Sequence, residues 1–171
     1  MSAEPRTTTV VRPIAPHEFE RVGDLVERAY RVAGHLEKDH GYDVVLRDVA
    51  DRARCGPVLV ATSAHDETAI VGSVTICPPG TLYAEIARSD ETELRFLAVE
   101  PAATRQGIAR TLVDAVIEYA RGADHRAVVL SVIDWNEPGL RLYDAMGFTR
   151  VPARDWTPVP DIRLLAFELE L

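Results

Sequence analysis

The stretch ELRFLAVEPAATRQGIAR, residues 93–110, decides the fold of this chain. Residues 93–99 are rich in apolar side chains, which indicates a strand, and residues 108–122 carry apolar side chains at helical spacing. Gly107 lies where the strand would turn into the helix. The first N–H groups of a helix have no partner inside it and, together with the helix dipole, attract phosphate. The stretch therefore predicts a phosphate-binding turn at a helix start.

Two better-known phosphate loops are excluded. The chain has no Gly-Lys-Ser/Thr sequence, so the loop of nucleoside-triphosphate hydrolases is absent. The dinucleotide-binding turn needs three spaced glycines, whereas this turn has Gly107 alone. By itself the turn would fit an ordinary helix start equally well, so the sequence that follows has to decide.

A second strand and helix follow. Residues 128–135 are mostly apolar and β-branched, which predicts a buried strand. Next comes NEPGLRLYDAMGF, residues 136–148, in which Asn136 suits a helix N-cap and Gly147 suits a helix stop. Asn136 and Tyr143 are seven residues apart, about two helical turns, and so project to nearly the same side.

This order of strand, single-glycine turn, helix, strand and Asn-x6-Tyr followed by Gly-Phe resembles the GCN5-related N-acetyltransferase (GNAT) superfamily. Those enzymes transfer an acetyl group from acetyl-coenzyme A to an amine. The resemblance runs from about residue 9 to the C-terminus, and residues 93–148 carry most of it. It implies an α+β (α/β) fold with a mixed, twisted, largely antiparallel sheet of about seven strands flanked by about four helices. It also implies a splay between the strands at 93–99 and 127–134.

The resemblance implies a role for each motif residue. Glu93 would be the general base, and Tyr143 would lie near the sulfur and protonate the departing thiolate. The cofactor-binding residues would be Leu97, Ala98 and Val99 along the pantetheine arm, Arg105, Gln106, Gly107, Ile108, Ala109 and Arg110 around the pyrophosphate, and Asn136 and Tyr143. Other interpretations remain open: Glu93 as a solvated strand-edge residue, Tyr143 as a core aromatic, Asn136 as a cap only, and the arginines as a solvated face.

Three positions depart from the family pattern. Thr104 stands three residues before the glycine, where Gln or Arg is usual, and this puts cofactor affinity in doubt. Arg105 follows where glycine is common, so its side chain could supply the missing cation. Ser131 stands five residues before Asn136, where the ribosomal-protein-acetylating branch carries glutamate. This argues against the mechanism of that branch.

The predicted chemistry is direct attack of a neutral amine on the thioester. A carboxylate such as Glu93 can take the proton, and a tyrosine can return one to the thiolate. No cysteine lies in the motif region to carry the acyl group. A rival interpretation is a non-catalytic acyl-coenzyme A sensor or regulatory module, and a third is a structural or interaction domain.

Bulk properties agree with a cytoplasmic transferase of bacterial type. The 171 residues suit a loose N-terminus, 1–8, and a single N-acetyltransferase domain, 9–171. The net charge of −8 opposes binding to nucleic acid or an anionic membrane. The five histidines show no metal-ligand spacing, and the two cysteines are predicted to be free thiols. We expect acetyl-coenzyme A, an amine acceptor of unknown identity, no metal, and a homodimer as one possible state.

The acceptor pocket would be shaped by segments outside the motifs, namely 33–43, 80–92 and 153–161. Asp39, Tyr42, Asp155 and Trp156 are candidates for contacting a cationic amine, although each would also suit an ordinary surface residue. In the central strand, alternation predicts Glu93, Arg95, Leu97 and Val99 on one side and Leu94, Phe96 and Ala98 on the other. The remaining predicted elements are strands at 10–14, 57–63, 69–77, 147–152 and 162–170 and helices at 16–32 and 44–53.

Overall fold

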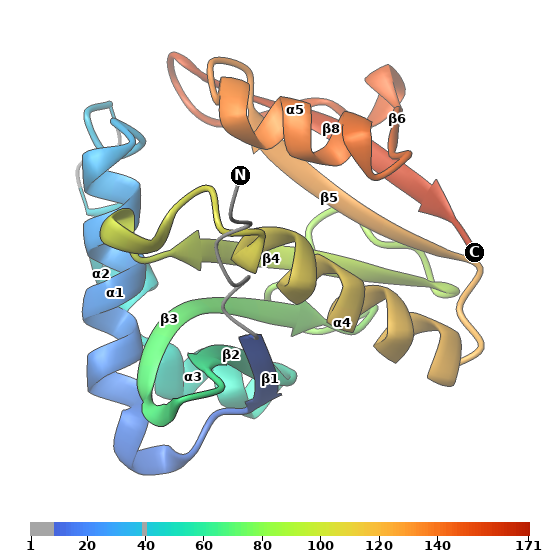
Figure 1. Cartoon of the computed structure of the whole chain (residues 1–171). Helices are drawn as coiled ribbons and strands as arrows, with labels where there is room; N and C mark the ends of the chain where they lie inside the picture. The colour runs from blue at the N-terminus through green and yellow to red at the C-terminus, as the bar shows by residue number, and fades with distance from the viewer. Residues whose placement is uncertain (1–8, 39–40) are drawn as a thin grey trace, which may run out of the picture.

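The computed structural model describes residues 9–38 and 41–171, so the predicted loose N-terminus, 1–8, and Asp39 lie outside the described residues. One eight-stranded sheet has the order β1-β2-β3-β4-β5-β8-β6, with β7 also paired to β8 (Figure 1). The strands are β1 (Thr9–Pro13), β2 (Val58–Ser63), β3 (Asp66–Cys77), β4 (Glu91–Val99), β5 (Ala127–Ile133), β6 (Thr149–Arg150), β7 (Trp156–Val159) and β8 (Ile162–Glu170). The helices are α1 (Phe19–Val32), α2 (Tyr42–Arg47), α3 (Val49–Cys55), α4 (Ile108–Gly122) and α5 (Glu137–Ala145), with short 3₁₀ turns at Pro16–Glu18, Pro101–Ala103 and Pro152–Arg154.

The predicted splay is confirmed between β4 and β5. These strands pair in parallel only from Glu91↔Ala127 to Leu94↔Leu130, and β4 then runs on to Val99 without β5. Every other strand pair in the described sheet is antiparallel. Figure 1 shows the two strands close together near the C-terminus and diverging toward α1.

A bulge in β4 makes the predicted alternation wrong. Ser73 pairs with Ala98 but Thr75 pairs with Arg95, so two residues of β4 oppose Val74 alone. Phe96 absorbs the irregularity with a φ of 55°. As a result, Leu94 packs in the core beneath α4, whereas Phe96 packs in the core beneath α1.

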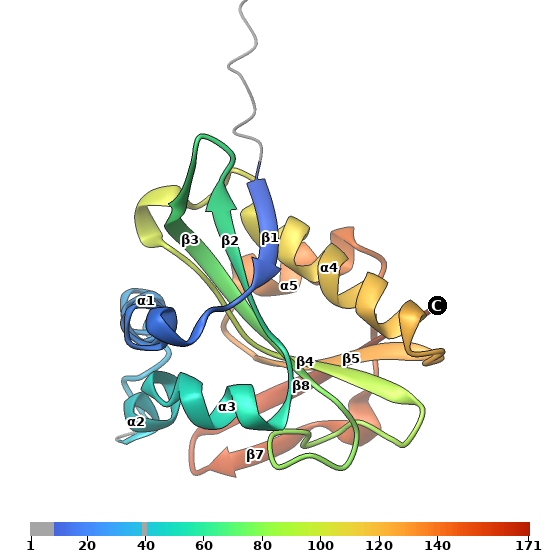
Figure 2. The same ribbon diagram turned by 90° about the horizontal axis from the view of Figure 1, so that it is seen from below.

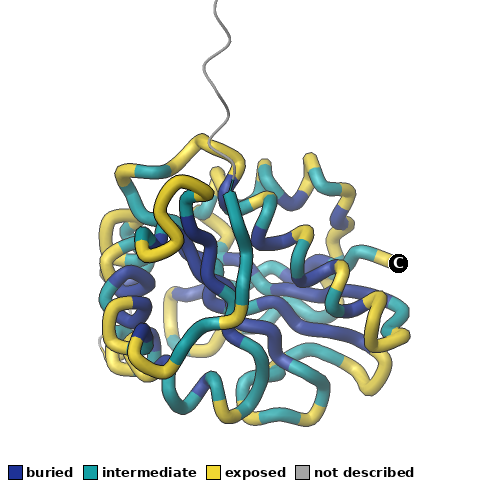
Figure 3. The backbone as a smooth tube through the Cα atoms, turned by 60° about the horizontal axis from the view of Figure 1, so that its bottom comes forward, coloured by how far each residue is buried: buried dark blue, intermediate teal, exposed yellow. Residues whose placement is uncertain are grey.

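Helices cover both faces of the sheet, with α4 and α5 on one side and α1, α2 and α3 on the other (Figure 2). Each face has its own buried apolar core, and the buried residues follow the central strands and the inward faces of the helices (Figure 3). The approach of α4 to β3 is close at Gly72, where a Cβ would lie 3.0 Å from both Ile108 Cγ2 and Leu112 Cδ1. This contact fixes the start of α4 over the sheet.

The other differences from the sequence prediction concern where helices and strands begin and end. The predicted helix 44–53 is two helices, because Asp48 leaves the helical region (ψ 66°) and caps α3 through its side chain, which accepts from the Asp51 N–H. The predicted strand 147–152 is reduced to Thr149–Arg150, and the segment 153–161, expected to shape the acceptor pocket, contains β7. In the described part of the chain, no helix is long and apolar enough to cross a membrane.

Candidate active site

A cavity of about 690 Å³ occupies the splay between β4 and β5. Its walls come from both halves of the sheet and from the segments around its mouth. The motif-derived residues in the walls are Glu93, Leu94–Val99, Thr104, Ser131–Ile133, Asn136, Pro138 and Tyr143. The other lining residues include Tyr30, His35, Tyr42, Glu85, Trp156, Pro158 and Ile162. The motif residues of β4, β5 and α5 are therefore brought together around one cavity, whereas residues 105–110 of the predicted phosphate turn do not line it.

The β4 edge of the cavity carries backbone groups without a strand partner. Leu97, Ala98 and Val99 lie beyond the last β4–β5 pair, and all three line the cavity. Backbone N–H and C=O groups are strong hydrogen-bonding groups that a ligand with amide groups can satisfy. This edge can therefore bind an extended amide-containing arm in the place of a strand.

The predicted phosphate turn has the backbone that such a site needs. Arg105 and Gly107 both have positive φ, 66° and 81°, and α4 begins at Ile108. The first intrahelical bond in α4 runs from the Thr111 N–H to the Gly107 oxygen at 3.0 Å, which leaves the earlier N–H groups for a ligand. Both arginines of the turn, Arg105 and Arg110, are exposed. The turn thus presents N–H groups and cations together.

Thr104 and Asn136 each make a local bond next to the cavity. The Thr104 hydroxyl donates to the Pro101 oxygen at 3.2 Å, so it closes a turn and contributes no cation. The Asn136 Oδ1 accepts from the Gly139 N–H at 3.1 Å, which makes Asn136 the N-cap of α5. Capping and lining coexist here, because Asn136 is also a cavity residue.

Tyr143 is a buried aromatic residue whose hydroxyl remains available. Its ring contacts Phe148 and Phe167, with centroids 5.5 and 6.4 Å apart, and the residue is 6% exposed. No side chain or backbone group among the described residues hydrogen-bonds to its hydroxyl. Burial raises its pKa above the ordinary value of 10, so it stays protonated at neutral pH and can donate.

Glu93 is a buried wall residue and not a solvated one. It is 1% exposed, and its Oε2 accepts the N–H groups of Glu85, Ile86 and Ala87 at 2.8, 2.9 and 3.1 Å. Burial raises the pKa of Glu93, and the three N–H donors oppose the rise. Sequence reasoning did not foresee that this carboxylate holds the segment before β4, although a glutamate followed by Arg95 in an apolar strand is an unusual signal.

The far side of the cavity contains residues that the motifs did not reveal. Tyr30 and His35 lie edge to face with ring centroids 5.6 Å apart, and burial lowers the pKa of His35, which keeps its imidazole neutral near pH 7. The Trp156 Nε1 donates to the Ser131 hydroxyl at 3.1 Å. At the position where one family branch has glutamate, this chain thus places a serine hydroxyl that is already hydrogen-bonded to Trp156.

Two of the predicted acceptor contacts, Tyr42 and Trp156, do line the cavity, but Asp155 does not. Asp155 accepts hydrogen bonds from Arg150 at 2.8 and 2.9 Å and from Arg163 at 3.1 Å. The Asp155 carboxylate is therefore paired with arginines of β6 and β8, and the expectation that it binds a cationic amine in the cavity is wrong.

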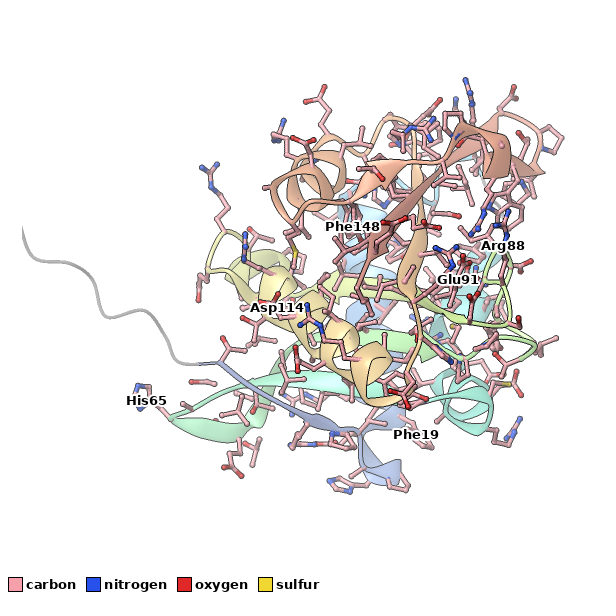
Figure 4. All side chains as sticks on the ribbon, turned by 90° about the vertical axis from the view of Figure 1, so that its right-hand side faces the viewer. Phe19, His65, Arg88, Glu91, Asp114 and Phe148 are labelled. Atoms are coloured by element: carbon pink, nitrogen blue, oxygen red, sulfur yellow. The ribbon has the colours of Figure 1, made fainter. Side chains whose placement is uncertain are left out.

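A charged cluster holds the closed end of the splay. Glu91, 0% exposed, pairs with Arg154 at 2.7 Å and with Arg126, and Arg126 also pairs with Glu168 of β8 at 3.2 Å. Figure 4 shows Glu91 at this end beside Arg88, whose N–H donates to the Glu91 carboxylate at 2.9 Å. The cluster joins β4, β5 and β8, and so fixes where the strands begin to part.

The residues present suit an acyl-coenzyme A: an open strand edge for the amide arm, an N–H turn with arginines for the pyrophosphate, and a tyrosine hydroxyl in the cavity. Residues 9–38 and 41–171 contain no group of three or more His, Cys, Asp or Glu placed to hold a metal ion.

Comparisons with known proteins agree with this geometry. The chain is 38% identical over 82 residues to N-alpha-acetyltransferase RimI of Mycobacterium tuberculosis, which covers 44% of the chain and 50% of that protein. It is 36% identical over 73 residues to the [ribosomal protein bS18]-alanine N-acetyltransferase of Haemophilus ducreyi, with 42% and 50% covered. The chain spans about half the length of the curated relatives it matches.

Solved structures share the fold over nearly the whole chain. A GNAT-family acetyltransferase from Staphylococcus aureus superposes with a TM-score of 0.74 at 16% identity, over 96% of this chain and 99% of that one. The structure of yncA from Salmonella typhimurium, described as an acetyltransferase and solved with its cofactor acetyl-CoA, gives 0.67 at 19% identity, over 95% and 94%. The family model described as Acetyltransferase (GNAT) family matches residues 19–148. This chain belongs to the GNAT acetyltransferase family.

Proposed function

We propose that the chain transfers an acetyl group from acetyl-coenzyme A to a primary amine of a small molecule or peptide by direct attack. One observation carries the proposal. A single cavity in the splay is lined by the open edge of β4, by the Glu93 carboxylate and by the unpartnered hydroxyl of Tyr143. A binding module needs the open edge alone, whereas transfer also needs the acid and the base.

The chain offers separate contacts for each part of the co-substrate. The N–H groups from Arg105 to Arg110 would hold the pyrophosphate, with the two arginines adding charge. The edge formed by Leu97, Ala98 and Val99 would bind the pantetheine arm, and Asn136 would contact it from the β5 side. A backbone N–H on β4 would polarise the thioester carbonyl, as fixed donors do in other acyl transfers.

Two side chains would move the protons. Glu93, directly or through water, would accept the proton of the attacking amine; its raised pKa makes it a stronger base than an exposed glutamate. Tyr143 would donate a proton to the sulfur as the thiolate leaves, because its hydroxyl is protonated and free. The new C–N bond forms as the C–S bond breaks, and the products are an N-acetyl amine and a thiol.

The acceptor amine has support from the relatives. The names of two of them specify the alanine of a ribosomal protein and an α-amino group as the acetylated positions. Ser131 accepts a hydrogen bond from Trp156 and has no carboxylate, so the proposed base is Glu93, which lines the cavity together with Glu85. An α-amino group would need less help from this base than a lysine side chain, since its pKa is lower by about 2 units.

The test is thiol release from acetyl-coenzyme A across a panel of amines, with the acetylated product identified by mass. We expect at least one amine to accelerate release above the rate in water. Binding of the co-substrate without release for any amine would favour the sensor interpretation. A lack of any thermal shift with acetyl-coenzyme A would refute both and leave a structural role.

A further inference from the structure

We infer that the acceptor, given the proposed acetyl transfer, is a small amine that also carries a carboxylate, such as an amino acid, and that Arg95 binds this carboxylate. The inference rests on the proposed function and adds the chemical class of the second substrate. It starts from an arginine in the cavity wall that the transfer step itself does not need.

Arg95 is held in place but not neutralised by a close partner. Its side chain is 17% exposed, lines the cavity, and donates from Nη1 to the Tyr83 oxygen at 2.9 Å. Its guanidinium carbon lies 4.7 Å from the centre of the Phe96 ring. Its Nη1 also lies 3.5 Å from Oε1 of Glu85, which is 41% exposed, and its Nη2 donates to the Tyr42 hydroxyl at 3.4 Å. A guanidinium can bind a carboxylate with two parallel N–H bonds of about 2.8 Å. The Nε of Arg95 has no hydrogen-bond partner among the described residues and its Nη2 has one long contact, so this edge of the guanidinium can still bind a carboxylate.

A second guanidinium lies behind the same wall. Arg52, on α3, is 0% exposed and donates from Nη1 to the Val45 and Leu46 oxygens, both at 2.8 Å. Its Nε and Nη2 have no hydrogen-bond partner, and its guanidinium carbon lies 4.4 Å from the centre of the Phe96 ring. No carboxylate of the described residues forms a salt bridge with Arg52. An uncompensated buried cation is costly to folding, and an anion bound in the cavity near Phe96 would lower that cost.

The charges on β4 match the two ends of an amino acid. Glu93 and Arg95 are two residues apart on one strand, before the bulge, so their side chains leave the same face about 6.6 Å apart. An amine directed at Glu93 would place a carboxylate on the neighbouring carbon toward Arg95. The aromatic side chains of Tyr30, Tyr42 and Phe96 border this part of the cavity and offer an apolar surface for the rest of the molecule.

A purely cationic acceptor, such as a polyamine, fits this wall less well. The charged side chains that line the described cavity are Glu85, Glu93 and Arg95. The Glu93 Oε2 already accepts three N–H groups. A second ammonium group would therefore lie near the Arg95 guanidinium and face a single exposed carboxylate, that of Glu85.

The experiment compares matched acceptors with the full chain and acetyl-coenzyme A. Each α- or β-amino acid is assayed for thiol release beside its carboxamide and its decarboxylated amine. We expect kcat/KM for the amino acid to exceed that of both partners by about 10- to 100-fold, as a charge-assisted bidentate contact predicts. In Arg95→Gln the preference should disappear, through a loss for the amino acid while the decarboxylated amine stays within about threefold. Arg121→Gln, on the exposed end of α4, is the matched control and should keep the preference.

Arg95→Lys is the second variant, for the case in which Arg95→Gln fails to fold. It keeps the positive charge but not the paired N–H donors, so its preference for the amino acid should lie between those of the unmodified chain and Arg95→Gln. A merely structural Arg95 would lower the rates of all three acceptor types together in both variants, and that result would overturn the inference. Equal rates of amino acid, amide and amine with the unmodified chain would also overturn it, while leaving acetyl transfer intact. No release with any amine would instead refute the proposed function.

Discussion

Replacing Glu93 separates its two roles, because one oxygen atom holds the backbone of residues 85–87 while the carboxylate as a whole is the proposed base. Glu93→Gln keeps an oxygen acceptor for the three N–H groups. Each bond changes from charge-assisted to neutral and weakens by about 1 kcal/mol, whereas removing a buried charge recovers a few kcal/mol of desolvation. We therefore expect the free energy of unfolding to stay within about 1 kcal/mol of the original.

Glu93→Ala would not be tolerated as well. It leaves the N–H groups of Glu85, Ile86 and Ala87 without an acceptor in a site where the side chain is 1% exposed. At about 1–3 kcal/mol for each orphaned group, with partial rescue by water, the loss should be about 3–5 kcal/mol. The difference between the two variants, measured by urea unfolding, reports the anchoring role alone.

The catalytic role appears in the rate and its pH dependence. A general base contributes about 10²- to 10⁴-fold, so kcat/KM of Glu93→Gln should fall by that factor. The raised pKa of Glu93 places the acidic limb of the original profile above pH 4.5, and the rate is lost as pH falls through this pKa. In Glu93→Gln the amine must lose its proton unaided, so the profile should move up toward the amine's own pKa of about 8–10.

The assay is thiol release between about pH 5 and pH 10, with a thermal shift by coenzyme A to verify the pocket and Glu118→Gln, an exposed α4 residue, as control. A Glu93→Gln variant that keeps kcat/KM within about threefold and an unchanged profile would refute the base assignment. The carboxylate would then serve the loop only, and His35 would be the next proton acceptor to test.

Three further changes test other parts of the site. Tyr143→Phe removes a hydroxyl without a described partner, so the free energy of unfolding should change by less than about 0.5 kcal/mol while kcat falls about 10²-fold or more; an unchanged kcat would remove Tyr143 from the acid role. Arg105→Gly relieves a positive φ and should stabilise the fold by about 1 kcal/mol while raising the Kd for coenzyme A several-fold, as calorimetry would show; tighter binding would contradict the charge argument. Glu18, bonded to Arg12 at 2.7 Å, has its pKa lowered to about 2. Its stabilisation, about 3 kcal/mol, is present above pH 4.5 and lost as pH falls through about 2, so acid unfolding of Glu18→Gln should lack this loss.

The motifs predicted the fold because they encode backbone geometry. Gly107 has the positive φ that the turn needs, and Asn136 caps α5 as its residue type suggests. The strand at 93–99 and the helix from Ile108 have strong periodicity, and both were placed correctly. These features depend on local chemistry, which a single sequence displays.

The β4 bulge could not be predicted because it is set by pairing with β3 and not by the residues of β4 alone. Phe96 is not a residue that favours positive φ, and nothing near it marks the irregularity. Strict alternation would have placed Phe96 with Leu94 beneath α4. The bulge instead turns Phe96 toward α1, where its ring stacks on the ring of Tyr42.

The same dependence on distant contacts explains why the acceptor side was harder to predict than the cofactor side. The proposed contacts to the co-substrate are mostly backbone groups of the chain. A turn or a strand end presents such groups whenever the fold forms. The proposed acceptor contacts are side chains drawn from separate elements: Tyr30 from α1, Tyr42 from α2, Arg95 from β4 and Trp156 from β7. Their meeting depends on the bulge and on the splay, and neither leaves a local pattern. Under the proposed function, substrate choice would thus be a property of tertiary packing, and we expect an exchange of Arg95 to alter specificity without touching the motifs that define the family.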